Sequence, residues 1–218
     1  YIEMRGMSNT LKGNIPHYVS ESNTQPGMPK YKDLNGDGVI DTNDRTMIGR
    51  GLPIHTGGFT NNFEYKGFDL SVFFQWSYGN DVLNANRLFF DSGFQKKREL
   101  NQYASYTDRW TPENPNSNIP AATNSSSNLV ISSRVVEDAS FLRLKTVTLG
   151  YTVPKTFLKK YKIDNARLYV AAQNLWTITG YSGYDPEVSI RSGGLTPGLD
   201  FSSYPRALSV SFGINLGF

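Results

Sequence analysis

The sequence has no cysteine and only two histidines, His17 and His55, among 218 residues. Without cysteine there is no disulfide framework, no thiolate metal site and no cysteine nucleophile. The two histidines lack the paired spacing of a zinc site, and no nucleophile motif accompanies them that would build a Ser-His-Asp triad. These absences leave little for metal-dependent or nucleophilic catalysis, and we predict that the chain is not an enzyme.

Long apolar runs and a strong charge bias are missing as well. The longest apolar run is five residues, 168–172, whereas a transmembrane helix needs about 20. The net charge is only +3, and the basic residues are scattered apart from 96–98 and four lysines within 155–162. Transmembrane helices are therefore excluded, and no basic stripe indicates a nucleic-acid partner. Both lysine clusters are interpreted as solvated turns.

Aromatic residues and glycine are plentiful instead, with 13 Tyr, 13 Phe and 20 Gly, a composition that favours strands and turns. Five segments alternate apolar and small or polar residues with the period of a strand that has one apolar face. They are Gly57–Tyr65, Phe68–Trp76, Phe141–Val153, Arg167–Ile178 and Leu208–Phe218. The terminal segment is the most regular and Arg167–Ile178 the least.

Short and long connections alternate between these strands. Only Lys66 and Gly67 separate the first two strands, and the short segment Pro154–Asn165 joins the third to the fourth. The connection between Trp76 and the third strand has roughly 60 residues, and the connection between Ile178 and the fifth strand has roughly 25. Outer-membrane barrels pair short periplasmic turns with long extracellular loops in this way. We predict an all-β fold, an antiparallel transmembrane β-barrel segment with long extracellular loops and both short connections in the periplasm.

An aspartate-rich loop at residues 33–44 carries the strongest chemical motif. Oxygen-bearing side chains occupy loop positions 1, 3, 5, 9 and 12, glycine occupies position 6, and a backbone carbonyl is available at position 7, as in an EF-hand. The predicted metal ligands are Asp33, Asn35, Asp37, Val39, Asp41 and Asp44. We predict that they bind a structural Ca²⁺. The alternative is a metal-free turn held by side-chain to backbone hydrogen bonds.

Two further carboxylates, Asp185 and Glu187, lie on either side of a proline. A glycosidase needs two carboxylates that face each other across the scissile bond, about 5 to 9.5 Å apart. Carboxylates this close in a loop more often cap turns, and Arg191 is an available ion-pair partner. We therefore expect no catalysis there.

Several phrases of the sequence together resemble the SusC/RagA-like TonB-dependent outer-membrane transporters of Bacteroidetes-type bacteria. The similar stretches keep the order of that family and cover most of the chain from Tyr31 onward, whereas residues 1–30 match poorly. They are 31–49, 57–81, 138–154, 172–187 and the terminal strand.

The resemblance implies that residues 1–218 are the C-terminal part of a 22-stranded barrel, with the plug domain and the TonB-contacting segment outside this chain. It implies an outer-membrane importer of glycans or peptides that works with a SusD-like lipoprotein and is embedded in outer-membrane lipid. Phe218 would then be the assembly signal for barrel insertion. Aromatics of the outer loops become candidate ligand contacts: Tyr78, Phe89, Phe90, Tyr103, Trp110, Tyr181 and Tyr184.

A soluble secreted protein is the alternative. A calcium-binding β-sandwich or a carbohydrate-binding module would also contain alternating strands and an acidic loop. Such a protein would fold as a monomer without detergent, because its apolar faces would be buried against each other.

Overall fold

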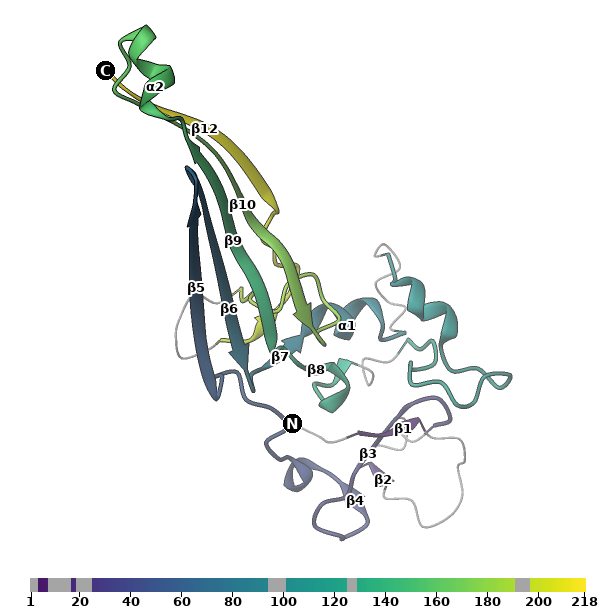
Figure 1. Cartoon of the computed structure of the whole chain (residues 1–218). Coiled ribbons are helices and arrows are strands. Elements are labelled where there is room, and N and C mark those ends of the chain that lie inside the picture. Colours follow the sequence, from purple (N-terminus) through teal and green to yellow (C-terminus); the bar gives the residue numbers. More distant parts are fainter. Residues whose placement is uncertain (1–3, 8–16, 19–24, 94–100, 125–128, 191–196) are drawn as a thin grey trace. The chain divides into compact units, whose positions relative to one another are not determined.

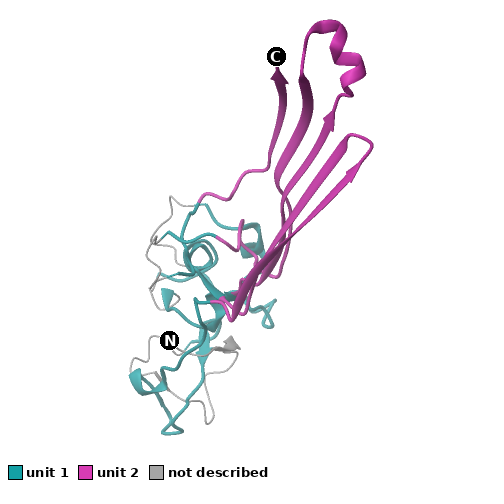
Figure 2. Ribbon diagram, turned by 60° about the vertical axis from the view of Figure 1, so that its left-hand side comes forward, with its two compact units in different colours: residues 1–52, 81–137, 188–203 teal, residues 53–80, 138–187, 204–218 magenta. Residues whose placement is uncertain are grey.

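The computed structural model describes residues 4–7, 17–18, 25–93, 101–124, 129–190 and 197–218. The chain divides into two compact units that are each discontinuous in sequence, and Figure 2 colours them separately. We call residues 1–52, 81–137 and 188–203 the loop unit, and residues 53–80, 138–187 and 204–218 the sheet unit. Among the described residues, no helix has the length and apolarity needed to cross a membrane.

The sheet unit contains five long antiparallel strands whose order in the sheet is their order in the chain (Figure 1). They are β5 (His55–Tyr65), β6 (Phe68–Tyr78), β9 (Phe141–Thr152), β10 (Asn165–Thr179) and β12 (Ser209–Gly217). All five predicted strands are confirmed, with bounds that differ from the prediction by at most two residues. Period-2 alternation was therefore sufficient to locate every strand of this sheet.

Both short connections are tight turns. Lys66 and Gly67 have φ values of 48° and 86°, and two consecutive positive values define the type I′ turn that suits a two-residue hairpin. The second connection contains α2 (Lys155–Leu158) and the 3₁₀ turn η6 (Lys159–Tyr161), and it ends at Lys162 with φ 56°. This pair of helical turns did not follow from the strand pattern.

One face of the sheet is apolar across all five strands, and we call it the apolar face. A single cross-strand row, for example, contains Phe63, Leu70, Leu149, Val170 and Phe212. These side chains are not buried: Phe212 exposes 82% of its surface and Phe63 exposes 60%. The sheet unit thus presents a broad, continuous apolar surface, which is unusual for a protein dissolved in water.

Two bulges explain where the sequence alternation is irregular. The pairing shifts between Phe73 and Phe74 of β6, which leaves Lys145 as an extra residue in β9. A second shift in β10 lies beside Asn174, whose φ is 53°. A bulge changes which residues of a strand face a given side. This is why β10, predicted from Arg167–Ile178, was the least regular segment.

The opposite face, which we call the polar face, needs glycine where long side chains cross neighbouring strands. A Cβ at Gly150 would collide with the Asp69 carboxylate and the Arg167 guanidinium, which form an ion pair. A Cβ at Gly213 would collide with the ring of Tyr169. The glycines in β9 and β12 therefore leave room for side chains that tie three strands together.

The loop unit is built from short elements. Strand β1 (Met4–Met7) pairs with β3 (Pro29–Tyr31), and β2 (His17–Tyr18) pairs with β4 (Val39–Ile40). A three-stranded sheet has the order β11 (Leu199–Asp200), β7 (Asp81–Asn84) and β8 (Val136–Asp138). The helical turns are η2 (Thr42–Asp44), α1 (Ala85–Phe90), η3 (Ala104–Asp108) and η5 (Ser133–Val135).

Burial in the loop unit follows the ordinary rule for soluble proteins. Val82 and Val135 expose 1% and 0% of their surface. Buried Asp91 forms ion pairs with Arg87 at 3.3 Å and Arg134 at 3.6 Å. Burial raises the pKa of the Asp91 carboxyl above its ordinary value, although both arginines oppose this effect. Polar pairs buried among apolar residues thus give these loops a core of their own.

Candidate functional site

The most elaborate charged site in the described part of the sheet unit lies on the polar face, around Arg143 of β9. Arg143 exposes 3% of its surface. Its Nη2 donates to Asp185 Oδ1 at 2.6 Å, its Nε donates to Thr177 Oγ1 at 3.0 Å, and its Nη1 lies 3.0 Å from Glu187 Oε2. One guanidinium therefore joins two strands to the loop segment that follows β10.

Further charged groups extend this site. Lys145, the bulge residue, donates to Gln75 Oε1 at 2.5 Å and lies 3.8 Å from Glu187. Arg206 forms an ion pair with Glu187, and its backbone N–H donates to Asp185 Oδ2 at 3.1 Å. We call this group the Arg143 cluster. Its members are Gln75, Arg143, Lys145, Thr177, Asp185, Glu187 and Arg206.

The electrostatics of the Arg143 cluster favour the ionised form of Asp185. Burial raises the pKa of the Asp185 carboxyl, but hydrogen bonds from Arg143 and from the backbone N–H groups of Glu187 and Arg206 outweigh burial and hold it below its ordinary value. An acid that stays ionised cannot donate a proton to a leaving group at neutral pH. The cluster is therefore suited to fastening a loop to strands β6, β9 and β10.

The sequence predicted this site only in part. Asp185 and Glu187 were recognised as turn or ion-pair residues, with Arg191 as the expected partner. Arg191 lies outside the described residues, and the structure pairs the two carboxylates with Arg143 and Arg206. A charged residue between Leu142 and Leu144 in a strand was the available clue to Arg143.

The aspartate-rich loop adopts a tightly hydrogen-bonded turn. Asp33 accepts hydrogen bonds from the backbone N–H groups of Gly36 at 2.6 Å and Gly38 at 2.9 Å. Asp37 accepts one from Val39 at 2.8 Å, and Asp41 caps η2 by accepting one from Asn43 at 2.6 Å. Asn35 accepts one from the backbone of Asp37 at 3.0 Å. The loop is organised by side-chain to backbone contacts.

Asp44 is the most deeply placed of these residues, with no exposed surface. The backbone N–H groups of Asp41 and Leu34 donate to its carboxylate and hold its pKa below the ordinary value. In the part of the chain that the structure describes, no three His, Cys, Asp or Glu side chains lie close enough together to hold a metal ion. Side-chain to backbone hydrogen bonds organise the loop, and Ca²⁺ binding stays a prediction.

The candidate ligand aromatics are divided between the two units. Phe89 and Phe90 in α1 pack against Phe201 and Tyr103, with ring centroids 5.3 Å and 5.6 Å apart. Trp110 packs over Gly27, where any Cβ would meet its indole ring. Four of the seven candidates, Phe89, Phe90, Tyr103 and Trp110, thus serve at least partly in packing within the loop unit.

The candidates in the sheet unit differ in exposure. Tyr181 is buried, Tyr78 is about half exposed and stacks on His55 at 5.1 Å, and Tyr184 exposes 81% of its surface. Tyr184 is therefore the most exposed of the three, and its contact with a ligand stays a prediction. Phe218, the predicted assembly signal, follows β12 and exposes 85% of its surface.

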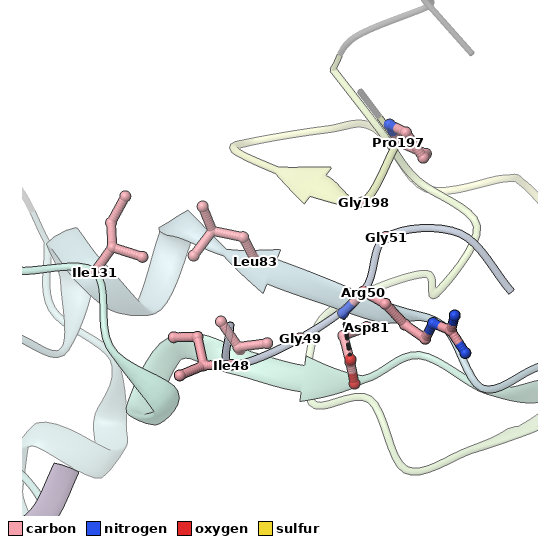
Figure 3. A pocket seen from close by; sticks show the side chains of 10 residues that line it. Ile48, Gly49, Arg50, Gly51, Asp81, Leu83, Ile131, Pro197 and Gly198 are labelled. Carbon is pink, nitrogen blue, oxygen red and sulfur yellow. Dashed lines mark hydrogen bonds between the residues drawn. The ribbon is translucent and has the colours of Figure 1, made fainter. Parts of the chain in front are cut away.

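A small pocket of about 100 Å³ lies within the loop unit. Figure 3 shows Ile48, Leu83 and Ile131 on one side of it and Pro197 on the other. The Asp81 carboxylate there accepts a hydrogen bond from the Arg50 backbone N–H at 2.8 Å. The volume suits a few water molecules or one small side chain, and the carboxylate is already engaged, so nothing here indicates catalysis.

Comparison with known proteins places the chain in a class of membrane receptors. It is 38% identical over 213 residues to TonB-dependent receptor P3 of Formosa agariphila, covering 94% of this chain and 21% of the relative. It is 28% identical to TonB-dependent receptor SusC of Bacteroides thetaiotaomicron, covering 92% of this chain and 18% of SusC. No protein-family model matches the chain.

Solved structures agree with the sequence relatives. The chain superimposes on a structure of the RagAB peptide importer in its closed-closed state with a TM-score of 0.75 and 26% identity, covering all of this chain and 22% of that one. The class is therefore that of the TonB-dependent receptors. Within it, the chain belongs to the SusC/RagA-like TonB-dependent transporters, and it spans about a fifth of the length of the relatives that it matches. These relatives are named as receptors and importers, which favours a function other than catalysis.

Proposed function

We propose that this chain forms part of the barrel wall of an outer-membrane, TonB-dependent importer of glycans or peptides. The observation that carries the proposal is the apolar face of the sheet unit, which continues across all five strands and stays exposed. In a barrel such a face meets lipid, while the polar face lines the lumen. Relatives named as TonB-dependent receptors and as a peptide importer support the same function.

The proposal gives the chain its partners. A SusD-like lipoprotein would cover the outer mouth, and TonB would act on a region outside this chain, in a complete barrel of 22 strands of which this chain supplies the C-terminal part. RagAB is named as a peptide importer, and SusC is named as a receptor alone. Both glycans and peptides therefore stay within the proposed substrate range.

The Arg143 cluster has a defined task in this function. It attaches the segment that contains Asp185 and Glu187 to the polar face, where the lumen would be. An attached segment presents its exposed residues, Tyr184 among them, at a fixed position. Transport would then proceed by binding and gated passage, with no bond chemistry in this region.

A charge placed on the apolar face tests the proposal. Val147→Arg, in the middle of central strand β9 and paired with Val72 on the apolar face, is expected to lower the level of the complete transporter in the outer membrane strongly, since an arginine facing lipid near the bilayer midplane costs about 2–4 kcal/mol. The matched control is Thr148→Arg, the neighbouring residue on the polar face. Quantitative immunoblots of outer-membrane fractions measure both variants.

Opposite outcomes separate the two candidate functions. Equal outer-membrane levels of both variants would overturn the assignment of the apolar face to lipid. The soluble alternative, a secreted calcium-binding β-sandwich or carbohydrate-binding module, requires that a second layer cover this face. In the described part of the sheet unit the face is exposed, so a monomer that folds without detergent would contradict the proposal.

A further inference from the structure

The short-turn end of the sheet unit gathers positive charge from segments that are far apart in the sequence. The backbone N–H of Thr152 donates to the Gly67 carbonyl at 2.8 Å, so the β5–β6 turn lies against the start of the β9–β10 connection. The backbone N–H of Asp164 donates to the Gly217 carbonyl at 2.8 Å. The first contact holds the β5–β6 turn, and the second holds the end of β12, against the lysine-rich connection. Figure 1 shows α2 beside the C-terminus.

Five lysines occupy this end, and all are exposed. We call them the lysine rim: Lys66, Lys155, Lys159, Lys160 and Lys162. With Arg167 they outnumber the carboxylates nearby, which are Glu64, Asp69 and Asp164, and Asp69 is already paired with Arg167. The rim therefore has a positive charge that the sheet unit does not itself neutralise.

Aromatic rings stand exposed among these lysines. Leu158 is buried and anchors the connection, whereas Phe157 and Tyr161 expose 69% and 67% of their surface. Tyr65 exposes 70%, with Lys66 Nζ 5.1 Å from its ring centroid. A soluble turn has no need to expose several rings among its lysines. At a bilayer surface, rings sit among headgroups while lysine stems extend toward phosphates.

We infer that the lysine rim binds the headgroups of anionic phospholipids at the edge of the bilayer. The inference rests on the proposed function, because the apolar face must lie in lipid for its short-turn end to reach a membrane surface. Lysines close to an anionic surface strengthen binding by about fivefold each. The partner is a negatively charged bilayer surface, for which phosphatidylglycerol is the probe.

The experiment measures lipid binding by the complete transporter, extracted and purified in detergent. Native mass spectrometry compares the binding of added phosphatidylglycerol with that of neutral phosphatidylcholine. Lys155, Lys159, Lys160 and Lys162 are replaced together, by glutamine in one variant and by arginine in the other. The arginine variant keeps the charge and is the matched control for any effect on folding.

The glutamine variant is expected to bind phosphatidylglycerol at least about tenfold more weakly, with phosphatidylcholine binding unchanged and the arginine variant like the parent protein. Unchanged phosphatidylglycerol binding by the glutamine variant would overturn the inference. Equal losses of phosphatidylglycerol binding in the glutamine and arginine variants would also overturn it. So would an equal loss of phosphatidylcholine binding, since neither result would depend on charge. A different result would contradict the proposed function, namely that the protein never enters the outer membrane.

Discussion

In the loop unit Val82 and Val135 expose at most 1% of their surface, whereas Phe212 and Phe63 of the sheet unit expose 82% and 60%. Both regions come from one chain of moderate hydrophobicity, with a mean hydropathy of −0.43. Burial of apolar surface is the main favourable term in folding when water is the solvent. The two buried valines of the loop unit follow this rule, whereas the apolar face of the sheet unit does not.

Polar groups show the reverse arrangement. The sheet unit buries Arg143 and Asp185 on its polar face, where each charge has a partner of opposite sign. Large apolar residues such as Phe63 and Phe212 are on the side that the chain itself leaves open. The comparison teaches that the two units handle apolar surface differently: the loop unit buries apolar side chains within itself, whereas the apolar face is left open, and we propose that lipid covers it.

The largest expected effect comes from breaking the buried charges of the sheet unit. Arg143→Met leaves the buried Asp185 carboxylate without its ion-pair partner, and removing one member of a buried pair costs about 3–5 kcal/mol. We expect a much lower unfolding temperature of the detergent-solubilised transporter, together with faster proteolysis within residues 180–190.

Arg167→Met is the matched control, because Arg167 lies in the same sheet and also forms an ion pair, with Asp69, but its side chain is 29% exposed. A pair this open contributes about 0–1 kcal/mol. Equal effects of the two substitutions would show that burial does not set the strength of the Arg143 cluster.

An intermediate loss of stability is expected when a side chain is added at Gly213 of β12. Gly213→Ala places a Cβ in the space that the Tyr169 ring occupies, and crowding of this kind costs about 1–3 kcal/mol. Gly217→Ala in the same strand is the control, since the nearest atom to its Cβ would be 3.7 Å away. Unfolding temperatures that fall equally in both variants would rule out the proposed packing of Tyr169.

The smallest effect concerns the loop unit and is local. If residues 33–44 bind Ca²⁺, adding the ion to a transporter first stripped of metal with a chelator should slow hydrogen exchange of the backbone amides of this loop. A ligand that binds only the ordered loop stabilises it. Asp37→Asn removes a predicted ligand and should abolish the response, whereas Asp108→Asn, an exposed carboxylate elsewhere in the loop unit, should keep it. If Ca²⁺ does not change the exchange rates of the parent protein, the metal-free turn is favoured.

Much of the sheet unit could be predicted from the sequence, since strand alternation is a local property. Leu208 through Phe218 alternate without a break, and the β5–β6 turn needs only Lys66 and Gly67 in succession. The acidic loop was likewise visible as a spacing of oxygen-bearing residues. By contrast, the short helices and strands of the loop unit have no sustained period, so α1, η3 and η5 were not foreseen.

The sequence by itself determined the five strands, their two faces and the resemblance to a transporter family, because each depends on the order of residues that are close together in the chain. Only the tertiary structure decided that Arg143 meets Asp185, which lies 42 positions away, that Gly213 makes room for Tyr169, and that Lys66 joins the lysines of the β9–β10 connection. These contacts depend on register and bulges across strands. No local pattern encodes them, since one residue of slip would turn each side chain to the other face.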